Sequence, residues 1–163
     1  MNYLAHLFLA RPTADSHFGN LLGDFRRGVD ISRFGNAVQL GLKNHYEVDR
    51  FTDSHTSVLA AKALFHESRR RFAPVALDIY FDHLLIKHWT LFTTQSFDDF
   101  REQSFSLLER RLPTMPRTMQ HSVLRIMLKK RGLPRQFLLL LSVFVSPTLF
   151  ILLWMISMRT KMK

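Results

Sequence analysis

The fold is indicated most clearly by residues 36–51, NAVQLGLKNHYEVDRF. The apolar residues Val38 and Leu42 recur at a helical interval, so we expect a helix with one buried face. His45 and Asp49 are also four residues apart, which places both side chains on one face, a single turn from each other. The two side chains can therefore reach a common point.

Further runs of mostly apolar residues with helical spacing lie on both sides of this stretch. Pro12 ends the first run, because proline disfavours helical geometry at the residue before it. Asp53 and Ser54 are good helix N-caps, so a break between two runs can occur there. No alternating strand pattern of useful length is present. We predict an all-α single-domain helical bundle with helices over residues 2–10, 16–25, 36–51, 52–72, 75–92 and 97–112.

Length and composition limit the class of protein. A chain of 163 residues can form one domain with a substantial core. The absence of cysteine excludes disulfides, thiolate zinc sites and cysteine nucleophiles. The first residues, MNYLAHLF, lack a basic segment and contain a histidine where a signal peptide would be apolar. We therefore expect a cytoplasmic protein.

The net charge of +10 is unevenly distributed. Residues 1–118 contain 15 Lys/Arg and 13 Asp/Glu, whereas residues 119–163 contain eight Lys/Arg and no acid. The positive charge thus belongs mainly to the C-terminal part, and we predict no nucleic-acid partner. Arg26-Arg27 and residues 69–71 form local basic clusters, which are either solvated surfaces or docking surfaces for an acidic partner.

Acidic and histidine side chains gather in segments that otherwise resemble apolar helices. Burying such groups is costly unless they are paired, and a divalent cation could pair with several at once. Oxygen and imidazole ligands suit Mn, Fe, Zn or Mg better than soft metals. Hydrogen-bonded His–Asp pairs are the alternative interpretation. The residues concerned are His6, Asp24, His45, Asp49, Asp53, Asp78, Asp82 and His83.

A metal site of this kind favours hydrolysis. A divalent ion makes hydroxide available near neutral pH and polarises a phosphoryl oxygen. The chain has no GxSxG elbow and no GxxxxGK[ST] loop, so neither a serine nucleophile nor a phosphate-binding P-loop is supported. Metal-assisted hydrolysis is therefore the reaction class that we expect.

Several short motifs, in order, resemble the bacterial acyl carrier protein phosphodiesterases. They are MNYLAHLFLA at residues 1–10, GNLLGDF at 19–25, the stretch from His45 to Asp53, and LDIYFDHL at 77–84 followed by His88-Trp89. The resemblance covers residues 1–89 well and residues 90–133 thinly. It implies an all-helical, manganese-dependent hydrolase that is distantly related to the HD-type phosphohydrolases. Such an enzyme removes the 4′-phosphopantetheine arm from the acidic holo acyl carrier protein.

The resemblance, together with the chemistry of phosphodiester cleavage, suggests roles for individual residues. Asp78 would be a further ligand or the base that orients water, and His83 or His88 would protonate the leaving serine. Guanidinium chemistry suggests that arginines bind the phosphate or the acidic carrier protein, and a solvated surface role is the equal alternative; these arginines are Arg50, Arg69, Arg70 and Arg71. The implied metal ligands are His6, Asp24, His45, Asp49, Asp82 and His83.

The chain departs from the family pattern at two places. Tyr46-Glu47 stands where two basic residues are usual, and Gly23 stands where alanine is common. Neither departure removes an implied ligand. The first one is expected to weaken contact with an acidic carrier protein.

The C-terminal part needs a separate interpretation. The segment Phe137–Met158 carries no formal charge and is long enough to cross a bilayer as a helix. An abrupt change of composition at Pro134 equally suggests a frame-shifted end, and a buried hairpin is a third alternative. We therefore divide the chain into a helical hydrolase domain, 1–133, and a tail, 134–163. A membrane span would place the protein at the inner membrane.

Two other classes of protein stay open. One is a membrane-associated helical protein whose His and Asp groups are only hydrogen-bonded. The other is a helical module that binds an acidic partner without turnover. A bound metal would argue against the first, and hydrolysis of the partner would argue against the second.

Overall fold

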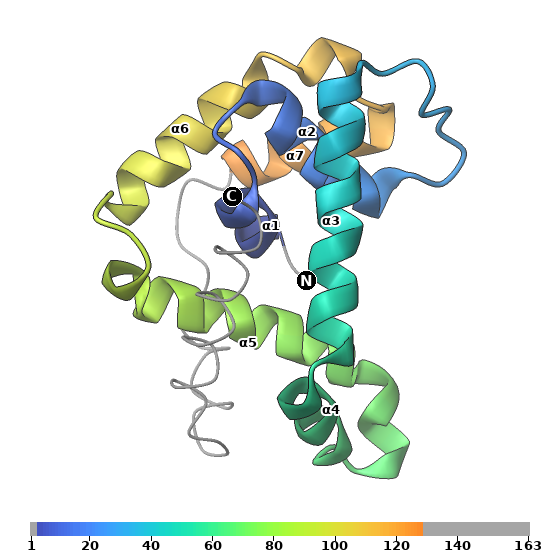
Figure 1. Cartoon of the computed structure of the whole chain (residues 1–163), viewed down its shortest axis with the longest axis vertical. Helices are drawn as coiled ribbons and strands as arrows, with labels where there is room; N and C mark the ends of the chain where they lie inside the picture. Colours follow the sequence, from blue (N-terminus) through green and yellow to red (C-terminus); the bar gives the residue numbers. More distant parts are fainter. Residues whose placement is uncertain (1–2, 129–163) are drawn as a thin grey trace.

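The computed structural model describes residues 3–128, and within them it is all helical, as the sequence predicts. Figure 1 shows α3 as the long upright helix, with α5 crossing near its lower end and α6 on the opposite side of α1 and α2. The elements are α1 (Tyr3–Leu9), α2 (Ala14–Leu22), η1 (Gly23–Phe25), α3 (Asn36–Ser54), α4 (Thr56–Ala63), η2 (Glu67–Phe72), α5 (Ala73–Lys87), η3 (Trp89–Leu91), α6 (Phe97–Glu109), η4 (Leu112–Thr114) and α7 (Arg117–Leu128).

Side-chain caps explain where several helices begin. The Thr13 hydroxyl accepts a hydrogen bond from the Ser16 N–H at 3.3 Å, and Ser96 accepts one from the Asp99 N–H at 3.0 Å. Both bonds satisfy an amide that lacks a partner within its own helix. These caps start α2 and α6.

The predicted run 52–72 is divided differently in the structure. The helix α3 continues to Ser54, and His55 has extended backbone angles that separate it from α4. The His55 imidazole caps α4 by accepting from the Ser57 N–H at 3.3 Å. Asp53 and Ser54, which the sequence suggested as caps, instead lie in the last turn of α3.

Two glycines let α2 and α3 pack closely. A Cβ on Gly19 would lie 2.2 Å from the Val38 carbonyl oxygen and 2.9 Å from the Gly41 Cα. A Cβ on Gly41 would lie 2.8 Å from the Ser16 carbonyl oxygen. Larger residues would therefore force the two helix backbones apart. This close crossing sets the position of α3 relative to the N-terminal helices.

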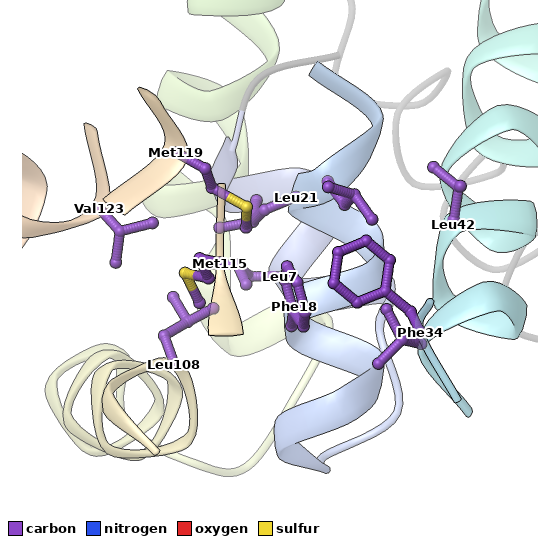
Figure 2. Packing of buried hydrophobic residues seen from close by; sticks show 11 residues of the cluster. Leu7, Phe18, Leu21, Phe34, Leu42, Leu108, Met115, Met119 and Val123 are labelled. Atoms are coloured by element: carbon purple, nitrogen blue, oxygen red, sulfur yellow. The ribbon is translucent and has the colours of Figure 1, made fainter. Parts of the chain in front are cut away.

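The core has two parts. One cluster joins α1, α3 and α5 around Leu85, Trp89 and Phe92. The other joins α1, α2, α3, α6 and α7, and Figure 2 shows Met119 directed toward Leu21 and Met115 directed toward Leu108. Together they fix α1 between α3, α5 and α6.

The predicted boundary at residue 134 and the apolar segment Phe137–Met158 lie outside the described residues. Among residues 3–128, no helix combines the length and the hydropathy that crossing a bilayer would require.

Candidate functional site

Two helices bring His6, His45 and Asp49 together. His6 comes from α1, and the pair His45 and Asp49 comes from α3, as its four-residue spacing predicts. His6 Nε2 lies 3.2 Å from Asp49 Oδ1, and His45 Nε2 lies 3.1 Å from Asp49 Oδ2. One atom from each residue lies within 4.8 Å of the other two. We call these three residues the histidine–aspartate cluster.

Both imidazole rings of the cluster are buried. They stack on each other with 4.0 Å between ring centroids, whereas the Asp49 side chain keeps 30% of its surface exposed. Gly23 makes room for the His45 ring, because a Cβ at residue 23 would lie 2.1 Å from His45 Cδ2. The cluster is thus fixed by packing and open to solvent on its carboxylate side.

The surroundings of the cluster favour a charged Asp49 and a neutral His6. Burial works against the charged form of Asp49, but hydrogen bonds from His45 and His6 outweigh it and hold the pKa of this carboxyl well below its usual range. Burial lowers the pKa of His6. A carboxylate therefore faces two imidazoles, of which His6 is biased toward its neutral form, the form that binds metals.

The donor set fits a divalent cation. Two imidazole nitrogens and a carboxylate are ligands of Zn, Mn or Fe. The Nδ1 atoms of His6 and His45 are buried and have no hydrogen-bond partner within residues 3–128. Buried polar atoms without partners are uncommon in structural clusters and often mark an absent water or ion.

The other predicted ligands lie around this cluster rather than in it. Asp24 is on η1 and exposed, and desolvation raises its pKa, although the nearby His45 and His6 act in the opposite direction. Asp82 Oδ1 accepts a hydrogen bond from the Ala5 N–H at 3.3 Å. Asp82 thereby joins α5 to the first turn of α1.

Burial raises the pKa of Asp82 to about 7. His83 is half-buried beside Lys87 and His88, and its pKa is lowered by burial first and then by these two neighbours. The group of residues whose ligand atoms lie within 4.8 Å of one another includes neither Asp82 nor His83.

The predicted catalytic residues Asp78 and His88 lie on α5 or at its end, whereas the predicted substrate-binding arginines lie on α3 and η2. Asp78 is half-buried one turn before Asp82, and its pKa is raised by burial and by the charges of Asp49 and Asp53. His88 ends α5 and is half-buried. The predicted arginines are exposed, one on α3 and three on η2: Arg50, Arg69, Arg70 and Arg71.

The structure also contains polar residues that the motifs did not single out. Asn44 donates to Asn20 Oδ1 at 2.8 Å and thereby connects α3 to α2 next to His45. The buried His17 lies 3.0 Å from the Arg11 carbonyl and 3.3 Å from Ser104 Oγ, so it is a hydrogen-bonded core histidine. A polar residue inside an apolar helix was the available signal for Asn20 and His17.

The chain resembles proteins of known family. A family model described as acyl carrier protein phosphodiesterase matches residues 1–135. The protein of that name from Serratia proteamaculans (strain 568) is 42% identical over 122 residues, which is 74% of this chain and 63% of the relative. Its namesake from Photorhabdus laumondii is 40% identical over 121 residues, which is 74% of this chain and 61% of the relative.

A third relative, from Escherichia coli O45:K1, is 40% identical over 110 residues and is covered to 55% of its length. The chain therefore spans less than two thirds of these relatives. No solved structure matches it.

Proposed function

Since this chain belongs to the acyl carrier protein phosphodiesterase family, we propose that it hydrolyses the phosphodiester of holo acyl carrier protein. Water adds to phosphorus, the bond from phosphorus to the serine oxygen breaks, and that oxygen takes up a proton. The products are 4′-phosphopantetheine and the apo carrier protein. The observation that carries the proposal is the Asp49 carboxylate held between His6 and His45.

The histidine–aspartate cluster would hold a divalent cation, which we propose to be Mn2+. When bound, such an ion supplies polarisation of a phosphoryl oxygen, a lowered water pKa and charge stabilisation in the transition state. Asp49 contributes the negative charge, and the two buried imidazoles contribute neutral donors. Asp24, Asp82 and His83 complete the ligand set that the family resemblance implies.

Proton transfers are assigned to residues on α5 or directly after it. Asp78 is close enough to Asp49 for their charges to interact, and its raised pKa makes it a better base than an ordinary aspartate. We propose that Asp78 orients or deprotonates the attacking water. His83 or His88 would protonate the serine oxygen, and the lowered pKa of His83 makes its protonated form a stronger acid.

The partner is proposed to be an acidic carrier protein. Exposed guanidinium groups suit both its carboxylates and its phosphate, and Arg50 and residues 69–71 provide them. We place the reaction in the cytoplasm. Association with the inner membrane through residues 137–158 is the alternative location.

The proposal is tested by the mass of purified holo acyl carrier protein after incubation with the full chain and Mn2+, with and without a chelator. Loss of the phosphopantetheine mass only with metal is the expected result. Asp49→Asn should abolish this loss. The matched control is Asp98→Asn, whose carboxylate is exposed on α6 and paired with Arg101 at 2.9 Å.

The second candidate function, binding without turnover, makes a different prediction. In that case the carrier protein would bind to the folded chain with the chelator present, and its mass would not change with metal. Unchanged mass from folded wild-type protein would overturn the hydrolase proposal.

A further inference from the structure

The adjacent arginines Arg26 and Arg27 differ in their surroundings, although both are exposed. The Arg26 guanidinium lies over the Tyr46 ring, with 5.9 Å from Cζ to the ring centroid. Within residues 3–128, Arg27 makes no such aromatic contact. The structure therefore distinguishes Arg26 from Arg27, which the sequence alone could not do.

Tyr46 connects Arg26 to the histidine–aspartate cluster. The Tyr46 ring meets the His45 ring edge to face, at 5.3 Å between centroids and 83° between planes. The Arg26 guanidinium thus lies at most about 11 Å from the His45 ring centre, because the two separations add fully only when aligned. An ion bound near His45 and the arginine charge could act on one small anion.

Arg50 brings a second positive charge to the same side of α3. Tyr46 and Arg50 are four residues apart, so their side chains are neighbours on the helix surface. This row lies about 100° around the helix from the row of His45 and Asp49. Neither Arg26 nor Arg50 forms an ion pair within the part of the chain that the structure describes. Both guanidinium groups are available to an anion.

The chemistry of these groups selects the ligand. A guanidinium presents several N–H donors in a plane that matches the oxygens of a phosphate. Stacking on Tyr46 restricts the Arg26 side chain before binding, so less conformational entropy is lost when the anion arrives. An apolar ligand would gain nothing from two charged, solvated groups.

We propose that Arg26, seated on the Tyr46 ring, binds the anionic phosphate of the substrate beside the histidine–aspartate cluster, together with Arg50. The inference rests on the proposed function for the identity of the phosphate-bearing substrate. It adds a phosphate-binding residue, Arg26, and an aromatic ring that positions it, Tyr46, neither of which the sequence motifs assigned. Arg26 is a binding residue, and Tyr46 is a positioning residue.

The first test measures the affinity of inorganic phosphate for the full chain, with a chelator present, by NMR titration. Arg26→Ala should weaken phosphate binding about fivefold to tenfold, as expected for one charge-assisted contact at an exposed site. The control Arg27→Ala removes the same charge and should change the affinity less than about twofold. Equal weakening by both variants, or none by Arg26→Ala, would overturn the inference.

Substitutions at Tyr46 test whether its ring positions the Arg26 guanidinium. Tyr46→Phe keeps the ring and should bind phosphate as the wild type does. Tyr46→Ala should lose about as much affinity as Arg26→Ala, and the double variant should lose no more, because both changes remove one unit. Circular dichroism confirms that each variant is folded. Additive losses in the double variant would refute a seating role for Tyr46.

Kinetics with holo acyl carrier protein separate this inference from the proposed function. Arg26→Ala should raise KM more than it lowers kcat, and Arg26→Lys should recover part of the loss. If the wild type hydrolyses the carrier protein and Arg26→Ala matches Arg27→Ala in both constants, the inference fails and the function stands. If phosphate binding depends on Arg26 but no carrier protein is hydrolysed, the phosphate site stands and the function fails.

Discussion

Replacing Asp49 by asparagine tests whether the histidine–aspartate cluster is a metal site. The change keeps the size of the side chain but removes the charge that faces His6 and His45 at 3.2 and 3.1 Å. An amide can still accept from one imidazole, but its NH2 group opposes the other. Without metal, we expect the free energy of unfolding to fall by about 1–2 kcal/mol, because one charge-assisted hydrogen bond is lost at a partly exposed site.

The effect on metal binding should be larger. The carboxylate is the only anionic member of the cluster, and even second-shell changes weaken metal binding by about 10-fold to 100-fold. At Mn2+ of about 100 times its dissociation constant, the wild type gains about 2.7 kcal/mol. A chain of this size should then melt about 5–10 °C higher. If Asp49→Asn weakens binding about 100-fold, the same Mn2+ adds about 0.4 kcal/mol and only about 1–2 °C.

The assay is a thermal melt of each protein with and without Mn2+, followed by circular dichroism. Asp98→Asn serves as the control, because it removes an exposed carboxylate on a different helix. Its Mn2+-dependent rise in melting temperature should equal that of the wild type. An equal rise in Asp49→Asn would show that the metal binds elsewhere and would refute the reasoning.

Three further predictions concern the fold, the pH dependence and the partner. Gly19→Ala should destabilise the protein by about 2–3 kcal/mol in urea unfolding, since its Cβ would lie 2.2 Å from a backbone oxygen of α3; Gly35→Ala, with open space around it, should cost at most about 1 kcal/mol. Because the pKa of Asp82 is raised to about 7, the native state binds an extra proton between about pH 4 and pH 7. The wild type should therefore lose about 2–4 kcal/mol of stability relative to Asp82→Asn as the pH rises through this window, and parallel unfolding curves for the two proteins would contradict this sign. Arg70→Glu should raise the KM for holo acyl carrier protein severalfold through charge repulsion, whereas Arg117→Glu on α7 should leave it unchanged, and equal KM values in steady-state assays would argue against docking at η2.

The local features of this protein follow from its sequence. Helical periodicity predicts an all-α fold for the described part, because each helix is specified by residues three and four apart. The same local geometry places His45 and Asp49 on one face of α3. Ordered motifs also predict the family, which the match over residues 1–135 confirms. The division at residue 134 and the full ligand set stay predictions.

Which distant groups meet depends on how the helices pack in three dimensions. His6 joins His45 and Asp49 because α2 packs against both α1 and α3, and the approach of α2 to α3 depends on Gly19 and Gly41. Asp82 contacts the start of α1, and Arg26 is seated on Tyr46. Helical spacing specifies the direction of a side chain around its own axis but not which helix will lie opposite. That choice depends on packing summed over the whole core, so it could not be obtained from any single motif.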